Sequence, residues 1–171
     1  LVISAHKDFD TLFKAIRILQ SKREDFILIL AGKGEDRTKL EKRVKEMGLS
    51  SNVRFSGFRK DVAALLKFSD IFVHTAYGEG LGTALIEAMA SGTPVVATAV
   101  GGIKETVKDE ETGYLVAAGD EVKLAEKLST LLDDKELRKK MGERGKERSR
   151  EFTAEKMAKK NFKHYQELLG E

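Results

Sequence analysis

A regular alternation of short apolar runs with longer amphipathic segments limits the fold of this 171-residue sequence more than any other feature. Phe26–Ala31 is a continuous apolar run ending at Gly32, as is typical of a parallel strand buried on both faces. Phe9–Leu19 instead repeats its apolar residues at helical spacing. Strands separated by helices need crossover connections, which favour a parallel sheet with helices on both faces. We therefore expect an α/β fold, a Rossmann-like doubly wound parallel sheet with C-terminal helices.

The rest of the chain follows the same alternation, and its length suits one domain. Further strands are expected at Leu1–Ser4, Val53–Ser56, Ile71–Val73, Pro94–Thr98 and Tyr114–Val116. Further helices are expected at Glu35–Met47, Asp61–Phe68, Thr83–Ser91, Lys104–Val107, Glu121–Leu132, Lys135–Glu151 and Thr153–Leu169. The apolar start of the chain has the character of the inner part of a strand, so we expect an excised domain, with processing of a longer chain as the alternative.

Composition excludes several classes of protein. The chain has no cysteine, which removes disulfide frameworks and thiolate metal sites, and its three histidines are far apart. Its longest apolar stretch is far shorter than the roughly 18 residues of a membrane span. Basic residues after Asp134 alternate with glutamates, which favours a solvated helix face over the alternative, a weak peripheral contact with a membrane. We expect a cytoplasmic protein in which any metal chemistry would have to rest on carboxylates. Without a basic stripe or stacking aromatics, we expect it to bind no nucleic acid.

The first candidate binding motif is Gly32-Lys33-Gly34, between the apolar run and the helix expected at Glu35–Met47. Backbone amides at such a helix start can approach a phosphate, which makes Gly34 a candidate contact for a nucleotide. The motif lacks the third glycine of the dinucleotide fingerprint, so an ordinary turn is an equally good interpretation.

The second candidate is a pair of glutamates, Glu79 and Glu87, separated by seven residues at the start of an expected helix. The glycines after Glu79 allow close backbone approach, and the amides of Leu81, Gly82 and Thr83 would point at an anion, as in a diphosphate cradle. Each carboxylate can accept hydrogen bonds from vicinal hydroxyls of a sugar. The alternative is that Glu79 is a solvated loop residue and Glu87 complements the helix dipole.

The segment from Asp70 to Gly82, continued from Glu87 to Thr98, closely resembles the Glu-x7-Glu region of one enzyme family. This is the family of retaining nucleotide-sugar glycosyltransferases of the glycogen-synthase and sucrose-synthase type (group 1, family four-like). The resemblance covers almost the whole chain. Further matches occur in the family's order at Gly32-Lys33-Gly34, Val53-Arg54-Phe55-Ser56-Gly57-Phe58, Val100-Gly101-Gly102-Ile103-Lys104-Glu105 and Thr112-Gly113-Tyr114-Leu115-Val116.

The resemblance implies a two-domain enzyme of the GT-B type, whose C-terminal domain holds the nucleotide-sugar donor and whose N-terminal domain holds the acceptor. Residues 1–171 look like the donor half, and the acceptor domain has no counterpart in this sequence. By similarity, Glu87 would bind the ribose, Glu79 the transferred hexose, and Lys7 the diphosphate leaving group. The backbone from Gly80 to Thr83 would bind the sugar and diphosphate, with Phe58 and Arg59 at the base. No metal is required in this scheme.

The sequence departs from the family pattern in two places. Ser4-Ala5-His6 stands where the family has a Gly-Arg pair before the lysine, and Thr75-Ala76 replaces a common Pro-Ser pair. Because the family's catalysis needs both domains, we expect this chain alone to bind donor weakly and to transfer little sugar. A nucleotide-sugar epimerase of the same architecture and a non-catalytic nucleotide-sugar-binding module stay open as alternatives.

Two other residues have a structural and a functional interpretation. His74, at the end of an expected strand, can touch the ligand, but a lone histidine there is more often packed and hydrogen-bonded. Glu105 follows Gly101-Gly102 and can belong to a cleft or simply to a helix start. We favour the structural interpretation for both.

Overall fold

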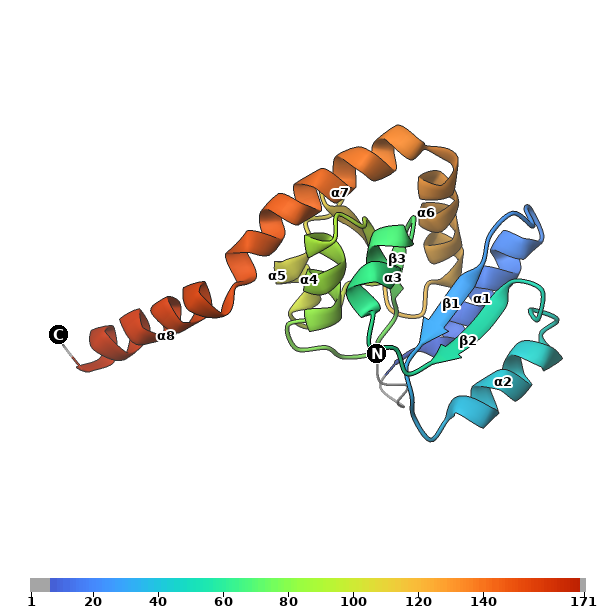
Figure 1. The fold of residues 1–171 in the computed structure, drawn as a ribbon, viewed down its shortest axis with the longest axis horizontal. Coiled ribbons are helices and arrows are strands. Elements are labelled where there is room, and N and C mark those ends of the chain that lie inside the picture. Colours follow the sequence, from blue (N-terminus) through green and yellow to red (C-terminus); the bar gives the residue numbers. More distant parts are fainter. Residues whose placement is uncertain (1–6, 170–171) are drawn as a thin grey trace.

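The computed structural model describes residues 7–169, except for the side chains at positions 160, 161, 163 and 164, and has the expected α/β fold (Figure 1). The strand expected at Leu1–Ser4 lies outside the described residues. The strands are β1 (Leu28–Ala31), β2 (Val53–Gly57), β3 (Phe72–His74), β4 (Val95–Thr98) and β5 (Gly113–Val116). The helices are α1 (Phe9–Gln20), α2 (Arg37–Glu46), α3 (Val62–Phe68), α4 (Thr83–Ala90), α5 (Ile103–Thr106), α6 (Glu121–Asp133), α7 (Lys135–Ser149) and α8 (Ala154–Leu169), with a 3-10 turn, η1 (Arg150–Phe152), before α8.

All pairs among the described strands are parallel, and these strands form two sheets. β1 pairs with β2, and β3, β4 and β5 form a three-stranded sheet in that order. Val96 lies at the centre of the larger sheet, where its Cα is in register with Val73 on one side and Tyr114 on the other. Each parallel connection passes through a helix, as predicted from the alternation of patterns.

Strand β4 shows why the helices cover both faces of the larger sheet. All of its residues are buried, and successive side chains of a strand point to opposite faces. Val96 joins an apolar cluster built mainly from α1, α6 and the β1–β2 pair. Val95 and Ala97 join a second cluster with residues of α3, α4 and α5. The sheet is therefore the middle layer of a three-layer arrangement, which is the Rossmann-like organisation expected from the sequence.

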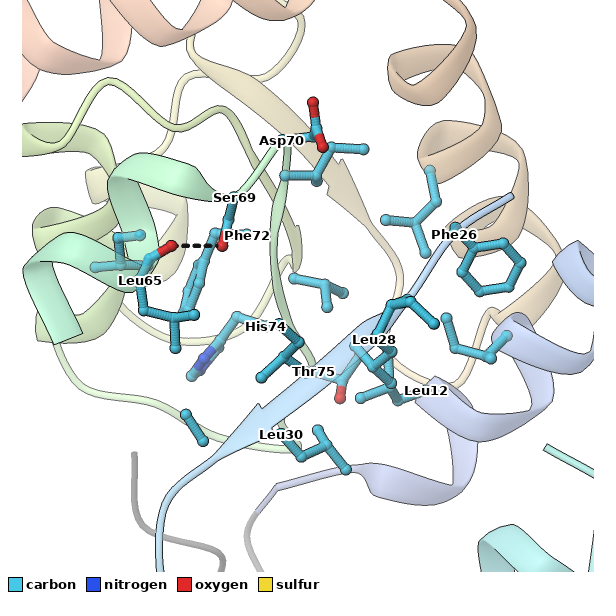
Figure 2. Close-up of a pocket in the computed structure, with 18 of the residues that line it drawn as sticks. Leu12, Phe26, Leu28, Leu30, Leu65, Ser69, Asp70, Phe72, His74 and Thr75 are labelled. Atoms are coloured by element: carbon cyan, nitrogen blue, oxygen red, sulfur yellow. Dashed lines mark hydrogen bonds between the residues drawn. The ribbon is translucent and has the colours of Figure 1, made fainter. Parts of the chain in front are cut away.

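The prediction that the run Phe26–Ala31 is buried on both faces is wrong. Ile27 is 52% exposed and Ile29 is 44% exposed. Both line an open groove of about 660 Å³ that lies between β1 and β3. Figure 2 shows Leu28 and Leu30 on the β1 side of this groove, and Phe72 and His74 on the β3 side. The apolar pattern was correct for a strand, but no layer of described residues covers this part of β1.

The C-terminal helices begin with a tight contact between α7 and α4. Gly142 of α7 lies so close to the turn after α4 that an added Cβ would be 2.0 Å from the carbonyl oxygen of Gly92. Helix α8 then extends away from the body of the molecule (Figure 1). Within the described part of the chain, no helix is long and apolar enough to cross a membrane.

Candidate functional site

The loop between β3 and α4 carries the predicted Glu-x7-Glu motif, and its path requires a glycine. Gly82 caps α4 with a left-handed backbone, φ 71°, which side chains with a Cβ rarely adopt. An added Cβ would also lie 2.8 Å from Cδ1 of Leu85. The sequence thus forces a sharp entry into the helix, and this turn presents the backbone from Gly80 to Thr83 at the end of the sheet.

The glycine pair Gly101-Gly102 packs directly against the backbone of this loop. A Cβ atom added to Gly101 would lie 2.0 Å from the carbonyl oxygen of Glu79. A Cβ atom added to Gly102 would lie 2.2 Å from the carbonyl oxygen of Gly80. The amide of Gly102 donates to the Glu79 carbonyl at 3.2 Å, and the Thr106 hydroxyl donates to the Leu81 carbonyl at 2.7 Å. The Gly101-Gly102 pair, seen in the sequence only as a break and a family match, therefore sets the position of the glutamate loop.

The structure brings Lys7 and Glu79 together, although they are 72 positions apart. Lys7 Nζ lies 2.5 Å from Glu79 Oε2, and the two side chains are 10% and 20% exposed. An isolated antiparallel bridge between Lys7 and Ala76 fixes the lysine beside the loop. The third member of this cluster is His74, whose Nε2 is 3.0 Å from Glu79 Oε2 and 3.2 Å from Lys7 Nζ.

The charges around Glu79 keep it ionised. Burial raises the pKa of this carboxyl, but the hydrogen bond and charge of Lys7, with a smaller contribution from His74, outweigh burial. The pKa of Glu79 therefore lies below its ordinary value of 4.5. A carboxylate held in this form is an acceptor only, as is needed to bind hydroxyl groups.

The surroundings of this cluster also agree with binding of an anion. Among the described residues, the amides of Leu81, Gly82 and Thr83 donate no backbone hydrogen bond. They are three hydrogen-bond donors at the start of a helix, where the helix dipole also favours a negative charge. Glu87 lies one turn inside α4 and is exposed; it lines the same groove as Lys7 and His74.

The remaining predicted residues follow β1 and β2. Lys33, beside Gly34, places Nζ 5.3 Å from the centroid of the Phe58 ring, which is 64% exposed. Arg59 forms an ion pair with Asp61, two positions further on. The described structure contains no hydrogen bond or ion pair that joins these residues to the Lys7–Glu79 cluster.

Two polar residues at the site were missed by the sequence analysis. Asp8 is buried, caps α1 by accepting from the Thr11 amide, and also accepts from the Tyr77 hydroxyl at 3.0 Å. This network ties the start of α1 to the glutamate loop. An aspartate directly before an apolar helical pattern is a recognised cap signal, so Asp8 was detectable, whereas its partner Tyr77 had no local signal.

Within the described residues, no group of three or more His, Asp or Glu side chains is arranged to hold a metal ion. The positive charge next to Glu79 comes from Lys7.

Comparison with known proteins identifies the family. The sequence matches the family described as "Glycosyl transferases group 1" over residues 2–148. This match covers most of the chain. The chain belongs to the group 1 glycosyl transferases. Its fold is that of the C-terminal domain in GT-B members of this group.

Individual relatives agree with this assignment. The N-acetyl-alpha-D-glucosaminyl L-malate synthase of Bacillus anthracis is 37% identical over 146 residues, which are 85% of this chain and 38% of that protein. The crystal structure of the C-terminal domain of LpcC, a group 1 family protein of Francisella tularensis, is 30% identical with a TM-score of 0.76; the match covers 85% of this chain and 79% of that one. Anabaena HepE in complex with UDP-glucose is 28% identical with a TM-score of 0.79, covering 86% and 42% of the two chains. The chain thus spans less than half the length of the curated relative and of HepE.

Proposed function

We propose that this chain is the nucleotide-sugar donor domain, residues 1–171, of a two-domain retaining glycosyltransferase that moves a hexose to an acceptor. The observation that carries the proposal is the Lys7–Glu79 pair beside the amides of Leu81, Gly82 and Thr83, which have no hydrogen-bond partner among the described residues. A cation and a helix N-terminus can bind the diphosphate of a nucleotide sugar, and a carboxylate can bind the hydroxyl groups of its sugar.

Each group has a role in this proposal. The amides from Gly80 to Thr83 bind the diphosphate and sugar, and Glu87 accepts hydrogen bonds from the ribose hydroxyls. Glu79 binds the hexose and stabilises positive charge that develops on its ring. Lys7 neutralises the negative charge that develops on the diphosphate as the glycosidic bond breaks, and such fixed charges stabilise a transition state. With Lys7 and the helix start supplying positive charge, the reaction requires no metal.

The base of the nucleotide would lie at the ends of β1 and β2, near Gly34, Phe58 and Arg59. The exposed Phe58 ring offers an apolar surface there, and its contact with Lys33 keeps it in place. HepE, which this chain resembles, was crystallised with UDP-glucose, so a uridine nucleotide is the first donor to test. The acceptor would be held by the N-terminal domain of the full enzyme.

Calorimetric titration tests the donor site. We expect saturable binding of one of UDP, GDP and ADP, and of its hexose conjugate, and loss of binding in Glu87→Ala. Glu143→Ala is the matched control, because Glu143 is an exposed glutamate on α7, outside the site. Absence of binding to every nucleotide at about millimolar concentration, or equal binding by Glu87→Ala and the control, would overturn the proposal.

A further inference from the structure

Two peptide units of the loop between β3 and α4 are held by hydrogen bonds from the same side. The Gly102 amide, at the start of α5, donates to the Glu79 carbonyl at 3.2 Å. The Thr106 hydroxyl, at the end of α5, donates to the Leu81 carbonyl at 2.7 Å. Thr106 is completely buried. Both hydrogen bonds therefore reach the loop from the side of α5.

These contacts determine where the amides of the same peptide units point. A peptide unit is planar and trans, so its N–H points opposite to its C=O. Because Thr106 holds the Leu81 carbonyl toward α5, the N–H of Gly82 points away from α5. The N–H of Gly80 does the same, since its peptide partner is the Glu79 carbonyl. Among the described residues, neither amide donates a backbone hydrogen bond. Helix α5 thus sets the direction of two amide donors.

The Leu81–Gly82 peptide has particular need of such an anchor. Gly82 has a left-handed backbone, φ 71° and ψ 56°, and glycine moves between backbone regions at low cost. The Thr106 hydroxyl has one proton, and the Leu81 carbonyl at 2.7 Å is a nearer acceptor than the Gly102 carbonyl at 3.1 Å. Loss of this hydroxyl would leave the peptide free to rotate and its amide without a fixed direction.

Arg148, near the end of α7, holds the end of α5 in place. Its Nε donates to the Thr106 carbonyl at 2.7 Å, and its Nη2 donates to the Glu105 carbonyl. Its guanidinium carbon lies 5.4 Å from the centroid of the Phe152 ring. Helix α5 has only four residues, which is too short to be stable without contacts from the rest of the fold. Arg148 therefore fixes the point from which Thr106 reaches the loop.

We propose that Thr106 is a positioning residue for the donor diphosphate, and that Arg148 keeps Thr106 in place; this rests on the proposed function. Thr106 aims the Gly82 amide at the phosphate oxygens without touching the ligand itself. Its hydrogen bond to the Leu81 carbonyl also polarises the peptide unit, which makes the Gly82 N–H a stronger donor. The binding machinery thus extends behind the loop to α5 and the end of α7.

Thr106→Val tests the role, because valine keeps the shape of threonine and removes the hydroxyl. We expect it to bind UDP, GDP or ADP, whichever the wild type binds, about tenfold or more weakly, since one hydrogen bond to a charged ligand is lost. Thr93→Val is the matched control. Thr93 is also buried, and its hydroxyl donates at 2.7 Å to the Leu66 carbonyl of α3. Thr93→Val should be destabilised to a similar extent and bind the nucleotide like the wild type in calorimetry.

Thr106→Ser separates positioning from folding. Serine keeps the donor but loses a buried methyl group, so we expect lower thermal stability with unchanged nucleotide affinity. Arg148→Met should weaken binding, whereas Arg144→Met, the same charge change at an exposed position of α7, should not. Equal affinity of Thr106→Val and Thr93→Val, equal weakening in Thr106→Ser and Thr106→Val, or equal affinity of the two arginine variants would overturn the proposal.

The carbon NMR signal of the Leu81 carbonyl tests the hydrogen bond without any ligand. We expect this signal to shift in Thr106→Val but to stay in place in Thr106→Ser and Thr93→Val. An unshifted signal in Thr106→Val would overturn the anchor, and a shifted signal with unchanged nucleotide binding would overturn the positioning role. If the wild type binds no nucleotide, the proposed function fails and the positioning role with it, and the carbonyl signal still decides whether Thr106 anchors the Leu81–Gly82 peptide.

Discussion

Replacing Gly102 by alanine should test whether the Gly101-Gly102 pair sets the position of the glutamate loop. Gly102 has an ordinary helical φ of −72°, so the new side chain causes no backbone strain and acts only through its contacts. The added Cβ would lie 2.2 Å from the Gly80 carbonyl oxygen, and ordinary contact begins at 3.4 Å, so the two segments have to separate by about 1.2 Å. The 3.2 Å hydrogen bond from the Gly102 amide to Glu79 cannot survive that movement.

Overpacking of this kind costs about 1–3 kcal/mol, and the lost hydrogen bond adds about 1 kcal/mol. Alanine also lowers the conformational entropy of the unfolded chain, which offsets about 0.4–1 kcal/mol of the lost stability. We therefore expect Gly102→Ala to lower the free energy of unfolding by about 2 kcal/mol, which moves the urea midpoint down by about 1 M.

Gly78→Ala is the matched control. It lies in the same loop, and an added Cβ there has no neighbour within 4 Å. Its effect should stay within about 0.5 kcal/mol. Urea unfolding followed by circular dichroism measures both variants, and nucleotide titration should show weaker binding for Gly102→Ala alone. Equal unfolding midpoints for the two variants would refute the claim that Gly102 presses on the loop.

Two further predictions follow from the structure. Gly142→Ala should lower the unfolding free energy by about 1–3 kcal/mol, because its Cβ would lie 2.0 Å from the Gly92 carbonyl oxygen. Gly145→Ala is the control on the same helix: the nearest neighbour of its Cβ is at 3.4 Å, so it should be neutral or slightly stabilising. Thermal unfolding measures both variants, and a less stable Gly145→Ala would refute the close contact at Gly142. The stabilisation from the Lys7–Glu79 pair should be present above pH 4.5 and lost as the pH falls through the lowered pKa of Glu79. The difference in unfolding free energy between wild type and Glu79→Gln should thus shrink on acidification, and a constant difference would refute it.

Most of the fold could be predicted because the relevant signals are local. Apolar spacing and glycine stops located the helices and strands of the described chain to within a few residues. The Glu-x7-Glu loop was found for the same reason, since both glutamates and the turn glycine belong to one short segment. Their roles remain predictions that the binding experiments will test.

The parts that could not be predicted depend on contacts between distant segments. Lys7 and His74 are 67 positions apart, and no local pattern indicates that the two side chains meet at Glu79. The exposure of Ile27 and Ile29 was missed for a related reason. An apolar run predicts a strand, but what covers it depends on which other strand or helix lies against it.

The division of the strands into two sheets has a consequence for how the molecule opens. Within the described residues, β1 pairs only with β2, so no backbone ladder joins this pair to the three-stranded sheet. Among these residues, side-chain packing against α1 and α6 holds the two parts together. We expect hydrogen exchange of their backbone amides to reveal two cooperative units of different stability, the β1–β2 pair and the three-stranded sheet. Phe58 and Arg59 follow the smaller unit and Glu79 follows the larger one, so local unfolding of the first would disassemble one half of the candidate site and leave the other half folded.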